Sequence, residues 1–244
     1  MGNNILWSVF TASYLHQLGV HHACISPGAR NSPLTYAFTE KSGITCFSHV
    51  DERSSAFFAL GLAKSTQSPV VLISTSGTAP ANFYPAVIEA SLSWVSLIIL
   101  SADRPDFLVN TGANQTINQQ NLYGIYVRFF LDVGLPNKEL GMLKETLDKA
   151  FHYSSGVKLE APPGPVHLNF PFDEPLMPES VEEINIPSLA STDQPKRESN
   201  IQIPILTEAK QPLIIIGPME GNTHQDEIIE LSGGINAPIL ADPL

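Results

Sequence analysis

Apolar residues in the first 170 positions follow two spacings, which together predict alternating strands and helices. Residues 70–73, Val-Val-Leu-Ile, and residues 97–100, Leu-Ile-Ile-Leu, are apolar at every position. Continuous apolarity is typical of strands that helices cover on both faces of a parallel sheet. The predicted strands are 22–25, 45–49, 70–75, 96–101, 128–132 and 164–169. The predicted helices are 4–18, 33–40, 54–65, 79–91 and 137–153. This order predicts an α/β fold with a doubly wound parallel sheet.

The pattern changes after residue 177. Residues 178–199 contain several Pro and Ser residues and few large apolar ones, which is typical of an interdomain linker. The α/β pattern then resumes with a helix at 201–209, a strand at 212–217, a helix at 224–233 and a strand at 238–241. Two strands and two helices of this length bury too little apolar surface for an independent core. We therefore predict a first domain over 1–177, a linker over 178–199 and an incomplete α/β domain over 200–244.

Composition narrows the class of protein. Charged residues make up 15% of the 244 residues, and the net charge is −11. No run of Lys or Arg occurs, which argues against a nucleic-acid partner. The sequence contains no apolar run long enough to predict a membrane-spanning helix. The N-terminus lacks the basic segment of a signal peptide. The only cysteines, Cys24 and Cys46, match no metal motif. We expect a cytoplasmic protein with reduced thiols.

Polar loops follow four of the predicted strands. In open α/β sheets, ligands bind beyond the carboxyl ends of the strands, so these loops are candidates for a binding site. Neither standard phosphate-binding glycine motif occurs, and Gly-x-Ser-x-Gly is also absent. The loops are 26–33, 49–53, 74–79 and 101–105, the last leading to 112–115.

Each loop also has a purely structural interpretation. Ser32 is suited to cap the next helix, with Pro33 in its first turn. Asp51 and Glu52 are suited to a helix start, where the helix dipole favours negative charge. His49 is too close to this pair in sequence for the three to make a good metal site. From spacing alone, the chain is an α/β ligand-binding domain.

Taken together, the loops resemble those of one family closely. Residues 26–34 read Ser-Pro-Gly-Ala-Arg-Asn-Ser-Pro-Leu, and residues 49–64 begin His-Val-Asp-Glu-Arg. Further matching stretches are 75–90, Ser-Ala-Asp-Arg-Pro at 101–105, Gly-Ala-Asn-Gln at 112–115, 164–176 and 237–244. The chain resembles, over nearly its whole length, the N-terminal part of the 2-succinyl-5-enolpyruvyl-6-hydroxy-3-cyclohexene-1-carboxylate synthases. These are thiamine-diphosphate enzymes of menaquinone biosynthesis.

The resemblance implies a three-domain subunit. Its first domain binds the aminopyrimidine of thiamine diphosphate, and its third holds the diphosphate through Mg²⁺ with a Gly-Asp-Gly motif. This chain contains no Gly-Asp-Gly. The resemblance therefore implies an N-terminal fragment that is inactive alone, taken from a homodimer or homotetramer.

For the cofactor, the resemblance implies that Glu52 is the catalytic carboxyl group that hydrogen-bonds the ring nitrogen N1′. We expect neighbouring Val50, Phe57 and Phe58 to give Glu52 an apolar setting, which would raise its pKa. Asp51 is then its structural neighbour. The remaining residues expected to line the cofactor pocket are Pro27, Gly77 and Thr78.

For the substrates, the resemblance implies that 2-oxoglutarate is decarboxylated and that the succinyl carbanion equivalent adds 1,4 to isochorismate, a transferase (carboligase) reaction. Arg30 and Arg104 match arginines that bind isochorismate, which suits the guanidinium fork because isochorismate has two carboxylates. Gln115 matches a glutamine that hydrogen-bonds the substrate or intermediate. Ala29 stands where the family often has Ser, so a hydroxyl contact is lost.

Two other interpretations stay open. The first is a different thiamine-diphosphate enzyme, either an acetolactate synthase or a 2-oxo acid decarboxylase. The second is a non-catalytic dimerisation module of the same fold. The stretches 101–105 and 112–115 favour the synthase family over the first, and the joint presence of Glu52, Arg30 and Arg104 argues against the second.

Overall fold

The computed structural model describes residues 2–156, 162–178, 210–217 and 224–241. It divides into two compact units, Met1–Asp193 and Gln194–Leu244. The linker predicted at 178–199 lies outside the described residues except for its first position, and so does the helix predicted at 201–209. The predicted domain limits stay predictions.

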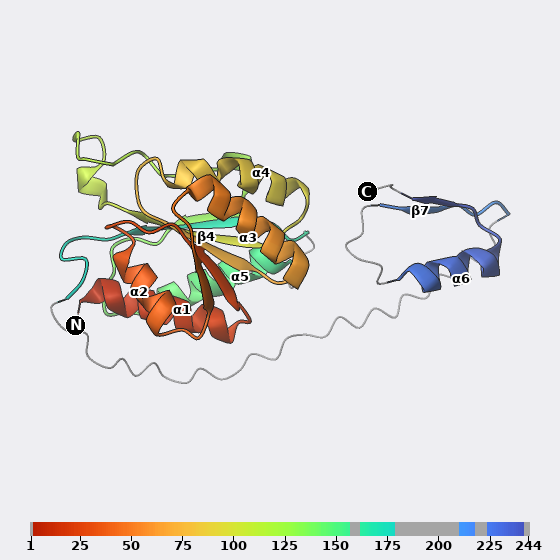
Figure 1. The fold of residues 1–244 in the computed structure, drawn as a ribbon, viewed down its shortest axis with the longest axis horizontal. Coiled ribbons are helices and arrows are strands. Elements are labelled where there is room, and N and C mark those ends of the chain that lie inside the picture. The colour runs from red at the N-terminus through yellow and green to blue at the C-terminus, as the bar shows by residue number, and fades with distance from the viewer. Residues whose placement is uncertain (1, 157–161, 179–209, 218–223, 242–244) are drawn as a thin grey trace. The chain divides into compact units, whose positions relative to one another are not determined.

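Six parallel strands form the centre of the first unit, in the order β2-β1-β3-β4-β6-β5 (Figure 1). They are β1 (His22–Ile25), β2 (Thr45–Ser48), β3 (Val70–Ser74), β4 (Leu97–Asp103), β5 (Phe129–Asp132) and β6 (Val166–Pro171). The chain passes from β1 outward to β2 and then crosses to β3 on the other side of β1. The predicted doubly wound α/β fold is confirmed, and the carboxyl ends of all six strands meet at one edge.

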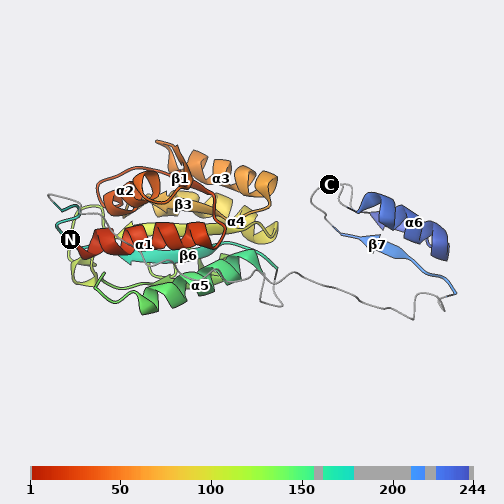
Figure 2. The same cartoon turned by 90° about the horizontal axis from the view of Figure 1, so that it is seen from below.

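Helices cover both faces of the sheet (Figures 1 and 2). One face carries α1 (Asn3–Gln17), α2 (Ser32–Glu40) and α5 (Gly141–Ser155), and the other carries α3 (Glu52–Thr66) and α4 (Tyr84–Leu92). Both apolar runs are buried at every position, as β3 and β4. Alternate residues enter separate cores, because Val71 packs with the first group of helices and Leu72 with the second. Among the described residues, no helix has the length and apolarity needed to cross a membrane.

Two predicted helices begin later than expected, for local reasons. The range 79–91 is split into a 3₁₀ turn, η1 (Pro80–Phe83), and α4. Pro85 lacks the N–H that a continuous helix would use there, so the chain restarts instead. At 137–140, Asn137 Oδ1 accepts a hydrogen bond from the Glu139 amide at 2.7 Å, and α5 begins only at Gly141. Two further 3₁₀ turns, η2 (Asp106–Leu108) and η3 (Gly124–Tyr126), lie between β4 and β5.

The second unit is a small α/β piece. Parallel strands β7 (Ile214–Ile216) and β8 (Ile239–Ala241) flank α6 (Gln225–Ile235) in sequence, which confirms the two strands and the helix predicted there. Ala237 is the only buried residue among its described positions, while Ile215 is 71% exposed. The described part of this unit therefore encloses no core of its own.

Candidate functional site

The loop after β1 is locked against the loop after β3. The Gly28 amide donates to Asn31 Oδ1 at 2.8 Å, and Asn31 Nδ2 donates to the Ser26 carbonyl at 2.9 Å. A Cβ at Gly28 would lie 2.6 Å from Thr75 Cβ, so only glycine allows this close approach. Pro27 is exposed at the tip of the loop. The loop is thus a rigid support for the arginine that follows.

The helix cap expected from Ser32 is not formed. Asn31 is the N-cap residue of α2, and Ser32 is already helical, with Pro33 in the first turn. Ser32 Oγ donates instead to the Ala29 carbonyl at 2.7 Å. The prediction was wrong because the Asn31 side chain is used inside the loop, which moves the helix start by one residue.

Arg30 is buried at this edge, with its side chain 9% exposed. Its Nη1 donates to the Phe172 carbonyl at 3.0 Å, just beyond the end of β6. Its Nη2 pairs with Glu174 Oε1 at 3.3 Å. The guanidinium group therefore joins the loop after β1 to the segment after β6.

Arg104 follows β4 and contacts two other loops through one nitrogen. Its Nη1 donates to Ser76 Oγ at 2.5 Å and to the Gln115 carbonyl at 2.8 Å. Within the described residues, Nη2 makes no hydrogen bond. Burial lowers the pKa of Arg104, and the like charge of Arg30 lowers it further, while Asp103 and Glu174 oppose this effect. The two arginines predicted to bind substrate thus lie close enough to interact.

Gly77 and Gln115 pack directly against each other. Gly77 has φ +80°, and a Cβ there would lie 2.8 Å from Gln115 Cγ. Gln115 itself adopts φ 53°, and its Nε2 donates to the Ser76 carbonyl at 3.2 Å. Thr78 is exposed beside them. The structure therefore brings Gly77, Gln115 and Arg104 together from three separate stretches of sequence.

Glu52 lies in the first turn of α3, with its side chain half-buried. Asp51 is the N-cap, and its Oδ1 accepts from the Ser54 amide at 2.7 Å. Hydrogen bonds from Ser54 hold the pKa of Asp51 below its ordinary value. Of this pair, Asp51 thus has the structural task, and the carboxyl group of Glu52 is left for other partners.

The apolar setting expected around Glu52 is not found within the described residues. Val50 is 94% exposed and Phe57 is 45% exposed. Phe58, 43% exposed, packs with Phe47 and His49, at ring distances of 5.1 and 4.9 Å. The expectation was wrong for this chain alone because these side chains face solvent instead of enclosing the carboxyl group.

A buried polar network behind these loops was not predicted. Asn169 on β6 is its centre, and all four of its side-chain hydrogen bonds are made. Its Oδ1 accepts from Ser101 Oγ at 2.7 Å and from Gln119 Nε2 at 2.8 Å. Its Nδ2 donates to Asp103 Oδ2 at 2.9 Å and to Asp132 Oδ2 at 2.8 Å.

The network reaches the site through two main-chain groups. Gln119 Oε1 accepts from the Gly77 amide at 2.8 Å, and Asp103 Oδ1 accepts from the Arg104 amide at 2.7 Å. Burial raises the pKa of Asp103, and the nearby carboxylates Asp132 and Asp106 act in the same direction. A polar residue inside a buried strand was the available sequence signal, since such residues nearly always have hydrogen-bond partners.

His167 ends the network on its inner side. Its Nε2 lies 2.7 Å from Ser101 Oγ. Because Ser101 has one proton and donates it to Asn169, the His167 nitrogen is the donor in this contact. Burial lowers the pKa of His167 to about 3, so the ring is neutral. This histidine supports the network and is remote from any acid–base task at the surface.

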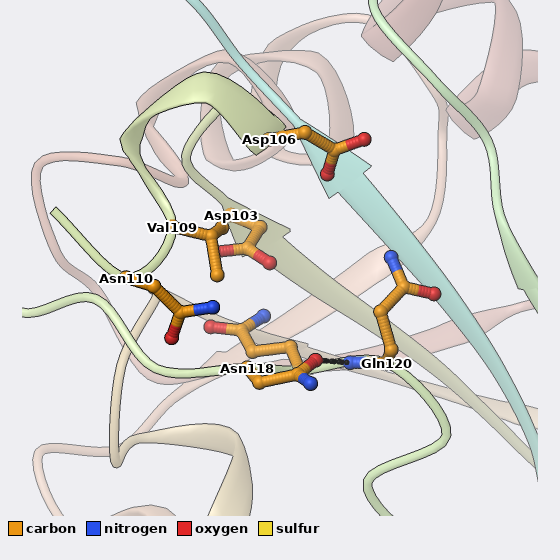
Figure 3. Close-up of a pocket in the computed structure, with 7 residues that line it drawn as sticks. Asp103, Asp106, Val109, Asn110, Asn118 and Gln120 are labelled. Atoms are coloured by element: carbon orange, nitrogen blue, oxygen red, sulfur yellow. Dashed lines mark hydrogen bonds between the residues drawn. The ribbon is translucent and has the colours of Figure 1, made fainter.

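A polar cavity of about 360 Å³ opens beside the end of β4 (Figure 3). Its lining residues are Asp103, Asp106, Val109, Asn110, Asn118, Gln119 and Gln120. The lining contains carboxylates and carboxamides but no cation, so it is unsuited to an anionic ligand. Within the described residues, no three His, Cys, Asp or Glu side chains form a group that could hold a metal ion.

The chain is similar to one family along its length. The family described as thiamine pyrophosphate enzyme, N-terminal TPP binding domain, matches residues 9–122. Proteins named 2-succinyl-5-enolpyruvyl-6-hydroxy-3-cyclohexene-1-carboxylate synthase match almost the whole chain. The protein from Chlorobium phaeobacteroides is 40% identical over 97% of this chain and 43% of its own length. The Halobacterium salinarum protein is 40% identical over 99% and 45%, and that of Geobacillus kaustophilus 41% over 97% and 43%. The chain thus spans less than half the length of these relatives.

Proposed function

The chain belongs to the 2-succinyl-5-enolpyruvyl-6-hydroxy-3-cyclohexene-1-carboxylate synthase family, and from this membership we propose that it supplies the pyrimidine-binding and isochorismate-binding side of such an enzyme. The complete enzyme would decarboxylate 2-oxoglutarate and transfer the succinyl unit to isochorismate by 1,4 addition. The observation that carries the proposal is geometric: the loops after β1 and β4 place Arg30 and Arg104 at the same edge of the sheet at which α3 places Glu52.

The Glu52 carboxyl group suits an aromatic nitrogen heterocycle because it is half-buried and does not cap α3, a task that Asp51 performs. Two apolar side chains of the same stretch of sequence, Val50 and Phe57, are exposed. Glu52 would hydrogen-bond a ring nitrogen and share its proton, while the apolar side chains would cover the ring. When bound, thiamine diphosphate supplies the electron sink for decarboxylation. Pro27, Gly77 and Thr78 would border the same pocket, and Mg²⁺ would be held by residues outside this chain.

Arg30 and Arg104 would each bind a carboxylate of isochorismate. Arg104 is held through Nη1 alone, so its Nη2 can donate to a ligand without breaking an existing contact. The guanidinium fork suits carboxylates because it offers two parallel N–H donors. The Gln115 carbonyl orients Arg104, and its side-chain amide would contact the substrate. Ala29 offers no hydroxyl, so substrate binding there would depend on the neighbouring arginine.

We further propose a cytoplasmic homodimer or homotetramer, in which another surface covers the exposed side chains near Glu52. Residues 1–244 alone would be inactive because the diphosphate-binding part is required for turnover.

The test is a reconstitution of the complete enzyme that contains this chain with thiamine diphosphate, Mg²⁺, isochorismate and 2-oxoglutarate. We expect CO₂ release and formation of the succinylated product, both dependent on 2-oxoglutarate. CO₂ release from pyruvate without use of isochorismate would instead indicate an acetolactate synthase or a simple decarboxylase. No CO₂ from either 2-oxo acid would indicate a non-catalytic module.

A further inference from the structure

Glu174 places a carboxylate on one of the two arginines at the site edge. Its Oε1 lies 3.3 Å from Arg30 Nη2. The Glu174 side chain is 74% exposed, whereas that of Arg30 is 9% exposed. The same carboxylate also raises the pKa of Arg104, against the effect of Arg30. Glu174 is therefore a solvent-facing anion that pairs with Arg30 and also acts electrostatically on Arg104.

Arg30 does not depend on Glu174 for its position. Its Nη1 donates to the carbonyl of Phe172, a residue that is fully buried. The Phe172 amide in turn donates to the Asp103 carbonyl at 2.9 Å, which extends the pairing beyond the end of β4. This buried main-chain anchor holds the inner nitrogen of the guanidinium group, so only the outer nitrogen, Nη2, is shared with Glu174.

The contact between Glu174 and Arg30 is also weak enough to exchange. Strong charge-assisted hydrogen bonds between nitrogen and carboxylate oxygen are shorter, about 2.7–2.9 Å. The Glu174 carboxylate is largely exposed and stays solvated when the pair separates, while Arg30 keeps its hydrogen bond to the Phe172 carbonyl. A ligand carboxylate approaching Nη2 would meet the like charge of Glu174, so the two cannot comfortably share this nitrogen.

We propose that Glu174 occupies Arg30 in the substrate-free protein and is displaced by a carboxylate of the substrate. This inference rests on the proposed function, in which Arg30 binds isochorismate. The internal carboxylate makes the site selective, since an anion must compete with Glu174 to reach Nη2. Specificity obtained by opposing the wrong ligands is a general device in binding sites. Glu174 thus lowers substrate affinity, whereas a residue that only positions Arg30 would raise it.

The test compares isochorismate binding by the 244-residue chain and its Glu174→Gln variant. Gln keeps the size of the side chain and removes its charge. In ¹⁵N-labelled protein, the side-chain Nε–H signals of Arg30 and Arg104 report binding directly. We expect the Kd of Glu174→Gln to be about three- to fivefold lower than that of the unmodified chain, the range that loss of an exposed ion pair allows.

Asp173→Asn is the matched control. It removes the same charge one position away, and among the residues that the structure describes the Asp173 carboxylate accepts only from the Glu174 amide, at 2.9 Å. We expect its Kd to stay within about twofold of the unmodified chain, since its carboxylate makes no contact with Arg30. Backbone amide spectra verify that all three proteins keep the same fold.

Three results would overturn the inference. They are an unchanged or higher Kd in Glu174→Gln, an equal fall in both variants, and Arg30 signals that do not respond to isochorismate in either the unmodified chain or Glu174→Gln. The reconstitution assay separates this inference from the proposed function. Turnover in the reconstituted enzyme without tighter binding in Glu174→Gln would contradict only the proposed role of Glu174. Tighter binding without turnover would contradict only the proposed reaction.

Discussion

The candidate site has an arginine side, around Arg30 and Arg104, and a carboxyl side, around Glu52. The two sides differ in how firmly the structure holds their residues. On the arginine side, Arg30, Arg104 and Gly77 are each held by hydrogen bonds to a neighbouring loop or to the buried network. On the carboxyl side, Glu52 has a capped helix start, but Val50 beside it is 94% exposed. The side chains and loops of one side are therefore fixed by hydrogen bonds, and the other side presents apolar surface to solvent.

The difference follows from where each half obtains its support. The arginine side is supported by β4 and β6, two interior strands of the sheet, whose polar side chains hydrogen-bond to each other behind the loops. The carboxyl side projects from α3 next to β2, which is an edge strand with partly exposed residues. We infer that the arginine side would bind carboxylates without help, whereas the carboxyl side needs a second surface before it can bind a cofactor.

Glu52→Gln should have the largest effect on activity, because it removes the group on the carboxyl side that is proposed to share a proton with the cofactor. In the complete enzyme we expect turnover to fall by about 10²–10³-fold, the usual contribution of a positioned acid–base group. The measurement is CO₂ release from 2-oxoglutarate at saturating substrates.

Asp51→Asn is the control for Glu52→Gln. Asn caps a helix as well as Asp does, so this variant should keep most of the activity. Loss of activity in Asp51→Asn with an unchanged rate in Glu52→Gln would mean that the two carboxyl groups have exchanged roles.

Asn169→Ala should destabilise the arginine side, because it removes the central residue of the buried polar network. It leaves the Ser101 and Gln119 donors without their acceptor, and it removes the amide that lies between Asp103 and Asp132. We expect the free energy of unfolding to fall by about 2–4 kcal/mol. Urea unfolding followed by tryptophan fluorescence reports on the first unit alone, since Trp7 and Trp94 are the only tryptophans.

Asn118→Ala provides the comparison for Asn169→Ala. Asn118 is exposed, and within the described part of the chain its Oδ1 accepts only from the Gln120 amide, at 2.9 Å. Its loss should cost less than about 0.5 kcal/mol, as for most surface changes. Equal losses in the two variants would show that the network does not stabilise the arginine side.

These two halves also differ in how well the sequence predicts them. The continuous apolar runs of β3 and β4 are sufficient to predict the sheet, because a strand buried on both faces has few alternatives. Their positions in the loops after β1 and β4 then place Arg30 and Arg104 at one edge. The assembly of Gly77 with Gln115 follows from the same topology, although the left-handed backbone of Gln115 is visible only in the structure.

The network and the exposed surface were beyond sequence reasoning for opposite reasons. Asn169 lies in the matching stretch 164–176, but Gln119 is 50 residues away and outside every matching stretch, so only the fold brings them together. Val50 and Phe57 are ordinary apolar residues in the sequence, and nothing in their local pattern distinguishes them from residues that become buried. Local patterns therefore predict elements and edges better than they predict partners.

Arg104→Ala should have a smaller and more selective effect than Glu52→Gln. It removes the guanidinium group that has an uncommitted Nη2, so we expect the KM for isochorismate to rise about tenfold, and more than the KM for 2-oxoglutarate. Arg53→Ala, an exposed arginine in the first turn of α3, serves as the control. A larger rise in the KM for 2-oxoglutarate would place Arg104 at the other substrate.

Val50→Ser should have the smallest effect on the chain and is the most direct test of the comparison between the halves. Because Val50 is 94% exposed, the free energy of unfolding of residues 1–244 should change by less than about 0.5 kcal/mol. In the complete enzyme, where another surface is proposed to cover this position, the Kd for thiamine diphosphate should rise about threefold. Ile125→Ser is the control, since Ile125 is 87% exposed but lies in η3, before β5 and away from the carboxyl ends of the strands. Equal effects of the two variants on cofactor affinity would mean that the exposed apolar surface near Glu52 has no special role in cofactor binding.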